Sequence, residues 1–243
     1  MKFLIEEFKK LICEIKTLSF KEVYIFISVA IIIFISFTLT NTSFYFRYIG
    51  SDILQSRIYW LLADGLMMFL IPVISIKFIF KEKLSDFGIK IGDLKFGLST
   101  LILFLIVMLP LVWIVSASES FAETYPQGGR ALLHNIPLLI FYEFCVLVYM
   151  LGWEFLWRGY MLFGLKEKFG YYAILIQMIP FFILHKGKPE LELFGAIFAG
   201  IILGIQSLRS NSFVYSWILH WLIMLSIDTI SVVRKVNNFY SIF

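Results

Sequence analysis

Residues 140–160 read IFYEFCVLVYMLGWEFLWRGY, an apolar run that also carries the charged side chains of Glu143, Glu154 and Arg158. The hydrocarbon core of a bilayer is about 30 Å thick, so a helix needs roughly 20 mainly apolar residues to cross it. At 3.6 residues per turn, Glu154 lies about 20° round the helix from Glu143, and Arg158 about 40° further. Because a charged side chain at mid-membrane costs about 2.5 to 3.5 kcal/mol, we expect this stripe to face protein or a water-filled cavity.

The composition extends this interpretation to the whole chain. Hydrophobic residues make up 60% of the 243 residues and charged residues 16%, whereas a soluble domain has about 45 to 50% and about 25%. The charges are too few to cover a water-facing surface, which excludes a cytosolic globular enzyme and a disordered tail. Cys13 lies in a charged leader and Cys145 in an apolar run, so no disulfide framework of a secreted scaffold is predicted.

Apolar runs with about the length of a membrane span recur along the chain. Five are long enough, residues 23–40, 58–80, 96–116, 136–165 and 213–233, and two are a little short, residues 171–184 and 193–208. The two short runs are separated by a segment with glycine and proline, which interrupt a helix. We therefore predict an all-α fold, a polytopic transmembrane helical bundle of about seven membrane helices with a broken or re-entrant pair.

The first 20 residues are amphipathic. Apolar side chains recur at spacings of three and four, and lysines lie mainly on the other side of the helix: Leu4, Phe8, Leu11, Ile12 and Ile15 against Lys2, Lys9, Lys10 and Lys16. Such a helix is suited to an anionic headgroup layer. We predict a leader over residues 1–20 that is retained at the membrane interface, with membrane lipid as its partner, and a single transmembrane domain over residues 21–243.

The basic residues are unevenly distributed between the connections. The leader and residues 77–95 are rich in lysine, and further basic residues, Lys166, Lys168 and Arg209, fall on the same side of the expected bundle. Cytoplasmic connections carry an excess of Lys and Arg. We therefore predict a multi-pass protein of the cell (inner or cytoplasmic) membrane with a cytoplasmic N-terminus, and leave the side of the C-terminus open because the short pair affects the crossing count.

Two histidines lie at or within apolar runs of the second half of the chain. His185 ends the run 171–184, and His220 lies in the run 213–233, where Asp228 follows about 80° round the helix and about 12 Å along it. A carboxylate near two imidazoles, shielded from lipid, can activate water and stabilise an oxyanion, or bind a divalent metal that does both. This pattern indicates hydrolysis.

Each of these residues also has a structural interpretation. Glu154 and Arg158 have the i, i+4 spacing of a salt bridge that fixes a helix. His185 could bind a carbonyl at a helix end, and His220 could join two helices by a hydrogen bond, as membrane bundles often do. All three structural interpretations would have to hold independently, each for a polar side chain whose burial in an apolar run costs free energy. We therefore favour a functional site.

Three segments carry a resemblance to a known family. Arg158-Gly159, residues 181–185 (FFILH) and His220 occur in the order of the motifs Glu-Glu-x-x-x-Arg, Phe-x-x-x-His and His-x-x-x-Asn. These are the signature of the membrane-embedded CAAX prenyl protease and bacteriocin-processing (CPBP) family, which the chain resembles over about residues 136–233. The resemblance implies an intramembrane endopeptidase, in which the first glutamate and first histidine activate water and the last histidine and the asparagine hold the oxyanion.

The chain departs from this signature at two positions. Trp153 stands at the first glutamate, so that Glu154 aligns with the second, and Met224 stands at the asparagine. Three alternatives therefore remain: Glu154 acts as the base in a variant site, Glu192 or Glu143 takes over this role, or the chain no longer cleaves peptides.

From the residues and the resemblance together we predict an intramembrane endopeptidase of CAAX-protease type, which hydrolyses a peptide or protein substrate with a glutamate-activated water in a membrane cavity and binds no nucleic acid. Glu154 would activate water with His185, and His220 would stabilise the tetrahedral intermediate. Arg158 would hold Glu154. Three acids would orient the imidazoles: Asp228, Glu192 and Glu143. The cofactor stays open between none and a divalent metal such as zinc, with His185, His220 and Glu154 as candidate ligands.

Two other functions fit part of the pattern. One is a catalytically inactive family member that acts as a bacteriocin-immunity protein or as a membrane scaffold or binding protein, which the substitutions Trp153 and Met224 favour. The other is a small transporter or proton relay, because intramembrane carboxylates and histidines also mark ion paths, although no inverted repeat is detectable.

Overall fold

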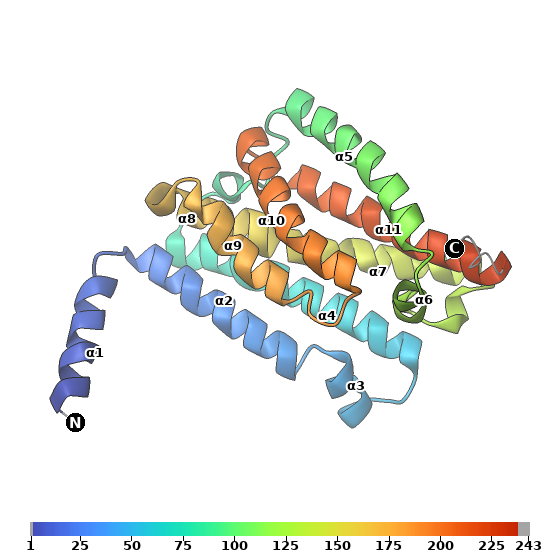
Figure 1. Ribbon diagram of the computed structural model, residues 1–243. Coiled ribbons are helices and arrows are strands. Elements are labelled where there is room, and N and C mark those ends of the chain that lie inside the picture. Colours follow the sequence, from blue (N-terminus) through green and yellow to red (C-terminus); the bar gives the residue numbers. More distant parts are fainter. Residues whose placement is uncertain (1, 238–243) are drawn as a thin grey trace.

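The computed structural model describes residues 2–237, and every regular element in that range is helical. The longer helices are α1 (Lys2–Ile15), α2 (Phe20–Thr38), α4 (Ile53–Ile74), α5 (Leu94–Val115), α7 (Ile136–Glu154), α9 (Tyr172–Ile183), α10 (Glu190–Ser210) and α11 (Val214–Asn237). The shorter ones are α3 (Thr42–Tyr48), α6 (Glu119–Thr124) and α8 (Leu162–Phe169), with 3₁₀ turns η2 (Leu84–Phe87) and η3 (Arg130–Leu132). Two π-helical turns, η1 (Ser75–Phe80) and η4 (Phe155–Met161), continue α4 and α7 without a break (Figure 1).

The helices confirm the predicted all-α bundle, with one correction. Within the described residues, six segments are long and apolar enough to cross a membrane: Phe20–Thr38, Ile53–Phe80, Leu94–Val115, Ile136–Phe169, Glu190–Ser210 and Val214–Asn237. Helix α9 is short, at 12 residues, as expected. The prediction of a second undersized helix over residues 193–208 is wrong, because α10 has 21 residues. Its terminal turns contain Glu190, Glu192 and Arg209, charged residues that an apolar run excludes but that the helix dipole favours at these ends.

The connections gather at two ends of the bundle. At the end where α2 begins, Lys21 binds Glu82, with 2.8 Å between Nζ and Oε2, and the Asp93 backbone N–H donates to the Ser210 carbonyl at 2.7 Å. Helices α3 and α6 and the end of α11 lie at the opposite end (Figure 1). We call these the basic end and the distal end.

Glycines bring α4 and α7 into backbone contact. A Cβ on Gly152 would lie 1.9 Å from the carbonyl oxygen of Gly65, and a Cβ on Gly65 would lie 2.6 Å from the Cα of Tyr149. Small residues allow such close packing of membrane helices, where van der Waals contact replaces the hydrophobic effect as the main attraction. The contact fixes the segment Tyr149–Glu154 against α4, and this segment carries the candidate site.

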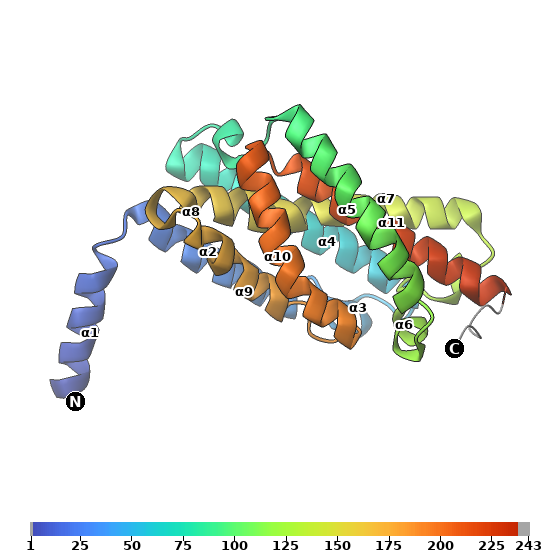
Figure 2. The same cartoon turned by 45° about the horizontal axis from the view of Figure 1, so that its top comes forward.

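The outermost helices present apolar side chains outward. Only 6% of the most apolar stretch of α5 is buried inside the protein. This helix lies across the outside of α10 and α11 (Figure 2). Helix α1 extends away from the bundle, and its apolar side chains, among them Phe3, Leu4 and Phe8, are exposed. Such exposed apolar surface is stable in contact with lipid.

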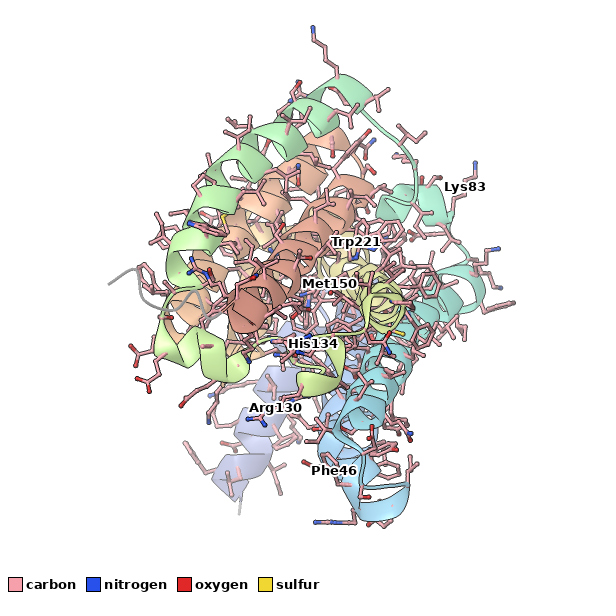
Figure 3. The ribbon with its side chains drawn as sticks, turned by 90° about the vertical axis from the view of Figure 1, so that its right-hand side faces the viewer. Phe46, Lys83, Arg130, His134, Met150 and Trp221 are labelled. Atoms are coloured by element: carbon pink, nitrogen blue, oxygen red, sulfur yellow. The ribbon has the colours of Figure 1, made fainter. Side chains whose placement is uncertain are left out.

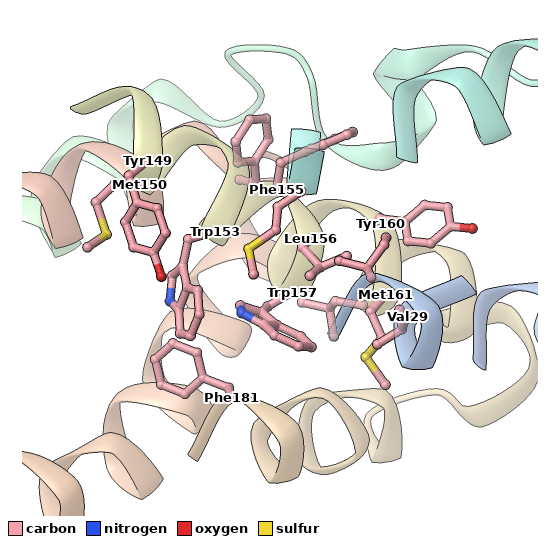
Figure 4. Close-up of a cluster of buried hydrophobic side chains, with 14 of the residues drawn as sticks. Val29, Tyr149, Met150, Trp153, Phe155, Leu156, Trp157, Tyr160, Met161 and Phe181 are labelled. Carbon is pink, nitrogen blue, oxygen red and sulfur yellow. The ribbon is translucent and has the colours of Figure 1, made fainter. Parts of the chain in front are cut away.

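The core beside the site is aromatic. Trp153 packs against Trp157 and Phe181, with 5.7 Å between ring centres in both pairs, and against Tyr149 at 5.8 Å (Figure 4). Aromatic rings bury large areas and have few rotatable bonds. They therefore hold the end of α7 in one position relative to α9.

Candidate active site

A fully buried ion pair lies at the junction of α7 and η4. Arg158 Nη1 donates to Glu154 Oε1 at 3.1 Å, and both side chains are 0% exposed. The Arg158 guanidinium also lies over the Phe181 ring, 3.9 Å from its centre, and reaches the Ala199 carbonyl at 3.5 Å. An adjacent cation favours the charged form of a carboxyl group and offsets part of the cost of burying it.

The same carboxylate oxygen binds His220 of α11. His220 Nδ1 lies 2.6 Å from Glu154 Oε1. A carboxylate oxygen only accepts hydrogen bonds, so Nδ1 carries the hydrogen, and in the neutral form of the ring Nε2 has a lone pair. Glu154 therefore sets both the tautomer and the orientation of His220, as the aspartate does in a Ser-His-Asp triad.

A cavity lies beside the His220 ring, with about 70 Å³ of space for water-sized molecules. This is enough for a few waters. Its wall has a polar part, formed by Gln127, His185, Lys188, Glu192, His220 and Asp228, and an apolar part that includes Trp60, Tyr149, Met150, Trp153 and Met224. In the view onto the distal end, Met150 of the cavity wall lies near the centre of the picture (Figure 3).

His185 lies in the connection between α9 and α10, and its ring is part of the cavity wall. Its Nδ1 lies 2.7 Å from the Phe181 carbonyl oxygen. That oxygen only accepts, so Nδ1 is the donor and Nε2 is again a lone pair. Burial lowers the pKa of His185 to about 4, so the ring is neutral at pH 7.

The connection between α5 and α7 closes one side of the cavity. Tyr125, which is 0% exposed, donates its hydroxyl hydrogen to Glu192 at 2.7 Å and accepts from Lys188 Nζ at 2.8 Å. Burial, with the Glu192 carboxylate nearby, raises the pKa of the Tyr125 hydroxyl well above its usual range, and burial lowers the pKa of Lys188. The phenol therefore stays protonated and links α10 to this connection.

Glu143 and Asp228 form a second buried acidic contact. Glu143 is 5% exposed and Asp228 1%, and their carboxyl groups lie within hydrogen-bond reach of each other. Both Glu143 oxygens and one Asp228 oxygen lack a donor among the described residues. Two carboxylates only accept, so this contact becomes a hydrogen bond when one group is protonated.

The structure brings together most of the predicted site residues, in an arrangement that differs from the expected one. Glu154 contacts Arg158 and His220 directly, while His185 lines the cavity with His220. Two predicted supporting acids, Glu192 and Asp228, also line it, whereas Glu143 lies behind Asp228. Glu154 is not among the residues that line the cavity, and its carboxylate contacts the ring of His220, which does line it.

Sequence reasoning missed two residues of the site. Tyr125 lies in a connection without a recognisable motif, and Lys188 lies in the segment with glycine and proline between the runs 171–184 and 193–208. The one signal available was the i, i+4 spacing of Lys188 and Glu192, whose charged atoms lie 3.7 Å apart.

The donor set does not fit a metal centre. Among residues 2–237, no group of three or more His, Cys, Asp or Glu side chains is placed to hold a metal ion. The candidate ligands His185, His220 and Glu154 do not form such a group, and of the three only the two histidines line the cavity. A catalytic zinc commonly has three protein ligands, which these residues do not supply.

Comparison with known proteins identifies the family of this region. Residues 135–226 match a family model described as Type II CAAX prenyl endopeptidase Rce1-like, which confirms the resemblance to the CPBP family. Together with the six long apolar helices, the match indicates a multi-pass membrane protein of the CAAX-protease type. A search of curated proteins and a search of solved structures gave no match.

Proposed function

We propose that this chain, with its Rce1-like region over residues 135–226, is an intramembrane endopeptidase that hydrolyses a peptide bond with a water held in the cavity. The observation that carries the proposal is the 2.6 Å contact between Glu154 and His220 at the cavity wall. A buried carboxylate that orients an imidazole at the wall of a space for water is the arrangement of a general base.

In the proposed reaction, His220 is the base. Its Nε2 takes a proton from the cavity water as the water oxygen bonds to the carbonyl carbon of the substrate, and the carbonyl π electrons move to the oxygen. When the tetrahedral species collapses, the C–N bond breaks and its electron pair stays on the leaving nitrogen, which receives the proton from His220. Glu154 stabilises the imidazolium in between, and Arg158 keeps Glu154 ionised and in place.

His185 has a positioning role in this mechanism. Its neutral ring presents a second lone pair to the same cavity, because its Nδ1 hydrogen is bound by the Phe181 carbonyl. Two lone pairs at the wall can accept both hydrogens of one water and turn its oxygen toward the substrate. This assignment moves the role of general base from Glu154 to His220.

A non-catalytic role is the second candidate, and one observation favours it. Glu154 does not line the cavity and forms an ion pair of the kind that also serves as a structural link, and neither Trp153 nor Met224 can take up a proton from water. In that case the cavity would serve only to bind a segment of a partner protein.

The deciding experiment is a cleavage assay on the full-length protein in liposomes. Hydrophobic peptides, including prenylated peptides that end in a CAAX sequence, are added, and new fragments are identified by mass spectrometry. We expect fragments with the wild type and with His134→Ala, a control at an exposed histidine near the distal end (Figure 3), but not with His220→Ala. Peptides that bind to the wild type without being cleaved would support the non-catalytic candidate.

We also propose that the basic end faces the cytoplasm. Lys21, Lys83, Lys90 and Lys166 lie at this end, beside the leader and its lysines. Cytoplasmic segments carry such an excess of positive charge. The connection formed by residues 184–189 then lies toward the outer side of the membrane.

A further inference from the structure

The indole of Trp153 contains a buried hydrogen-bond donor without a partner. Trp153 is 6% exposed, and its Nε1 has no acceptor among the described residues. Most buried polar groups in folded proteins are hydrogen-bonded, because an unsatisfied donor destabilises the fold. An unpaired donor at this position indicates an acceptor that is not part of the chain.

The position of Trp153 indicates where that acceptor binds. Trp153 lines the cavity with His185 and His220. Figure 4 shows its indole between Tyr149 and Phe181, with the nitrogen on the side of Tyr149, which lines the same cavity. Trp157 provides a contrast: its Nε1 is also buried without a partner, but Trp157 does not line the cavity. The contact with the cavity distinguishes Trp153.

The Trp153 ring is held in one orientation. Its centre lies 5.8 Å from that of Tyr149, and 5.7 Å from the rings of both Phe181 and His185. A donor fixed by packing needs no reorganisation when charge develops on its acceptor, which is the main advantage of a preorganised site.

Other donors on the cavity wall are the amide of Gln127 and the ammonium of Lys188, which donates to Tyr125, whereas the two imidazoles provide none. His185 and His220 each use the Nδ1 hydrogen within the protein, so both present lone pairs. The thioether of Met224, on the same wall, has no hydrogen to donate. A carbonyl group is complementary to this wall, since its oxygen accepts from the indole while its carbon is open to a water held by the imidazoles.

We propose that the Trp153 indole N–H donates a hydrogen bond to the carbonyl oxygen of the scissile peptide bond. It stabilises the negative charge that this oxygen gains when water adds to the carbon. No covalent bond to the indole forms or breaks, and its hydrogen stays on nitrogen throughout. The inference rests on the proposed hydrolysis and makes Trp153 a catalytic residue.

The direct test is an NMR experiment on the full-length protein in detergent with ¹⁵N-labelled tryptophan. The probe is a hydrophobic peptide aldehyde, whose hydrate resembles the tetrahedral species and should bind more tightly than a substrate. The indole signals of Trp153 and Trp157 are assigned with Trp153→Phe and Trp157→Phe. We expect saturating aldehyde to move the Trp153 N–H signal downfield and to leave the Trp157 signal in place. A Trp153 signal that does not move overturns the inference.

A kinetic test separates this inference from the proposed function. Trp153→Phe keeps an aromatic ring and removes the donor, so kcat should fall by about 10²- to 10³-fold, while KM changes by less than about three-fold because the interaction belongs to the transition state. Cleavage by this variant at the wild-type kcat overturns the inference and leaves the hydrolase assignment intact. A wild type that cleaves no peptide refutes the proposed function, and the NMR shift still decides whether Trp153 binds a carbonyl.

Discussion

Removal of the Arg158 guanidinium should destabilise the protein, because it leaves the buried carboxylate of Glu154 without its cation. Arg158 and Glu154 are both 0% exposed and 3.1 Å apart, and one oxygen of Glu154 already lacks a donor among the described residues. Breaking such a pair from one side costs about 3 to 5 kcal/mol. At about 2 to 4 °C per kcal/mol for a chain of this size, Arg158→Met should lower the melting temperature by about 6 to 20 °C.

The assay is thermal unfolding in detergent, with two further variants. In the double variant Glu154→Gln/Arg158→Met both charges are gone, so its stability should return to within about 2 kcal/mol of the wild type. The matched control is Arg209→Met, since Arg209 pairs with Asp93 at 3.5 Å while 64% exposed, and it should cost less than about 1 kcal/mol. If Arg158→Met and Arg209→Met unfold at the same temperature, the ion pair does not stabilise the site.

Three further perturbations test other parts of the account. Gly152→Ala should separate α7 from α4 and lower the free energy of unfolding by about 1 to 3 kcal/mol or more, because its Cβ would lie 1.9 Å from the backbone of α4. The control Gly195→Ala, which has open space around its Cβ, should be tolerated. Equal melting temperatures of the two variants would contradict the close packing. If Glu143 and Asp228 hold one proton between them, Glu143→Gln should remove the infrared carbonyl band of a protonated carboxyl group and keep or raise the stability of the protein. A band that persists in both Glu143→Gln and Asp228→Asn would exclude the shared proton. Cys13, exposed on α1, should react with a membrane-impermeant maleimide only after the cells are permeabilised, and labelling of intact cells would reverse the orientation.

The membrane-spanning helices were largely predictable because lipid imposes a simple length and composition on each of them. The run 136–165 begins at the residue where α7 begins, and the short run 171–184 corresponds to α9. The exception was α10, which was predicted too short because its charged terminal turns lie outside the apolar run 193–208. An apolar run measures the part of a helix that lies in hydrocarbon, and a helix can continue into the interface with acidic residues at its start and basic residues at its end.

The site was predictable only in part. The spacing of Glu154 and Arg158 along one helix is a local property and gave their contact correctly. The contact of Glu154 with His220 joins residues 66 positions apart, and that of Tyr125 with Glu192 joins residues 67 positions apart. Such pairs depend on how helices pack, which no local pattern specifies. For the same reason, the sequence did not reveal that Glu154 lies behind His220 rather than on the cavity wall.

The most direct test of the central claim is the rate of peptide cleavage by Glu154→Gln, His220→Gln and the double variant. If Glu154 acts by orienting His220, each single change should lower kcat by at least about 10²-fold, and the double variant should be no slower than His220→Gln alone, because the two residues act as one unit. Cleavage by His220→Gln at the wild-type rate would contradict the assignment of His220 as the base.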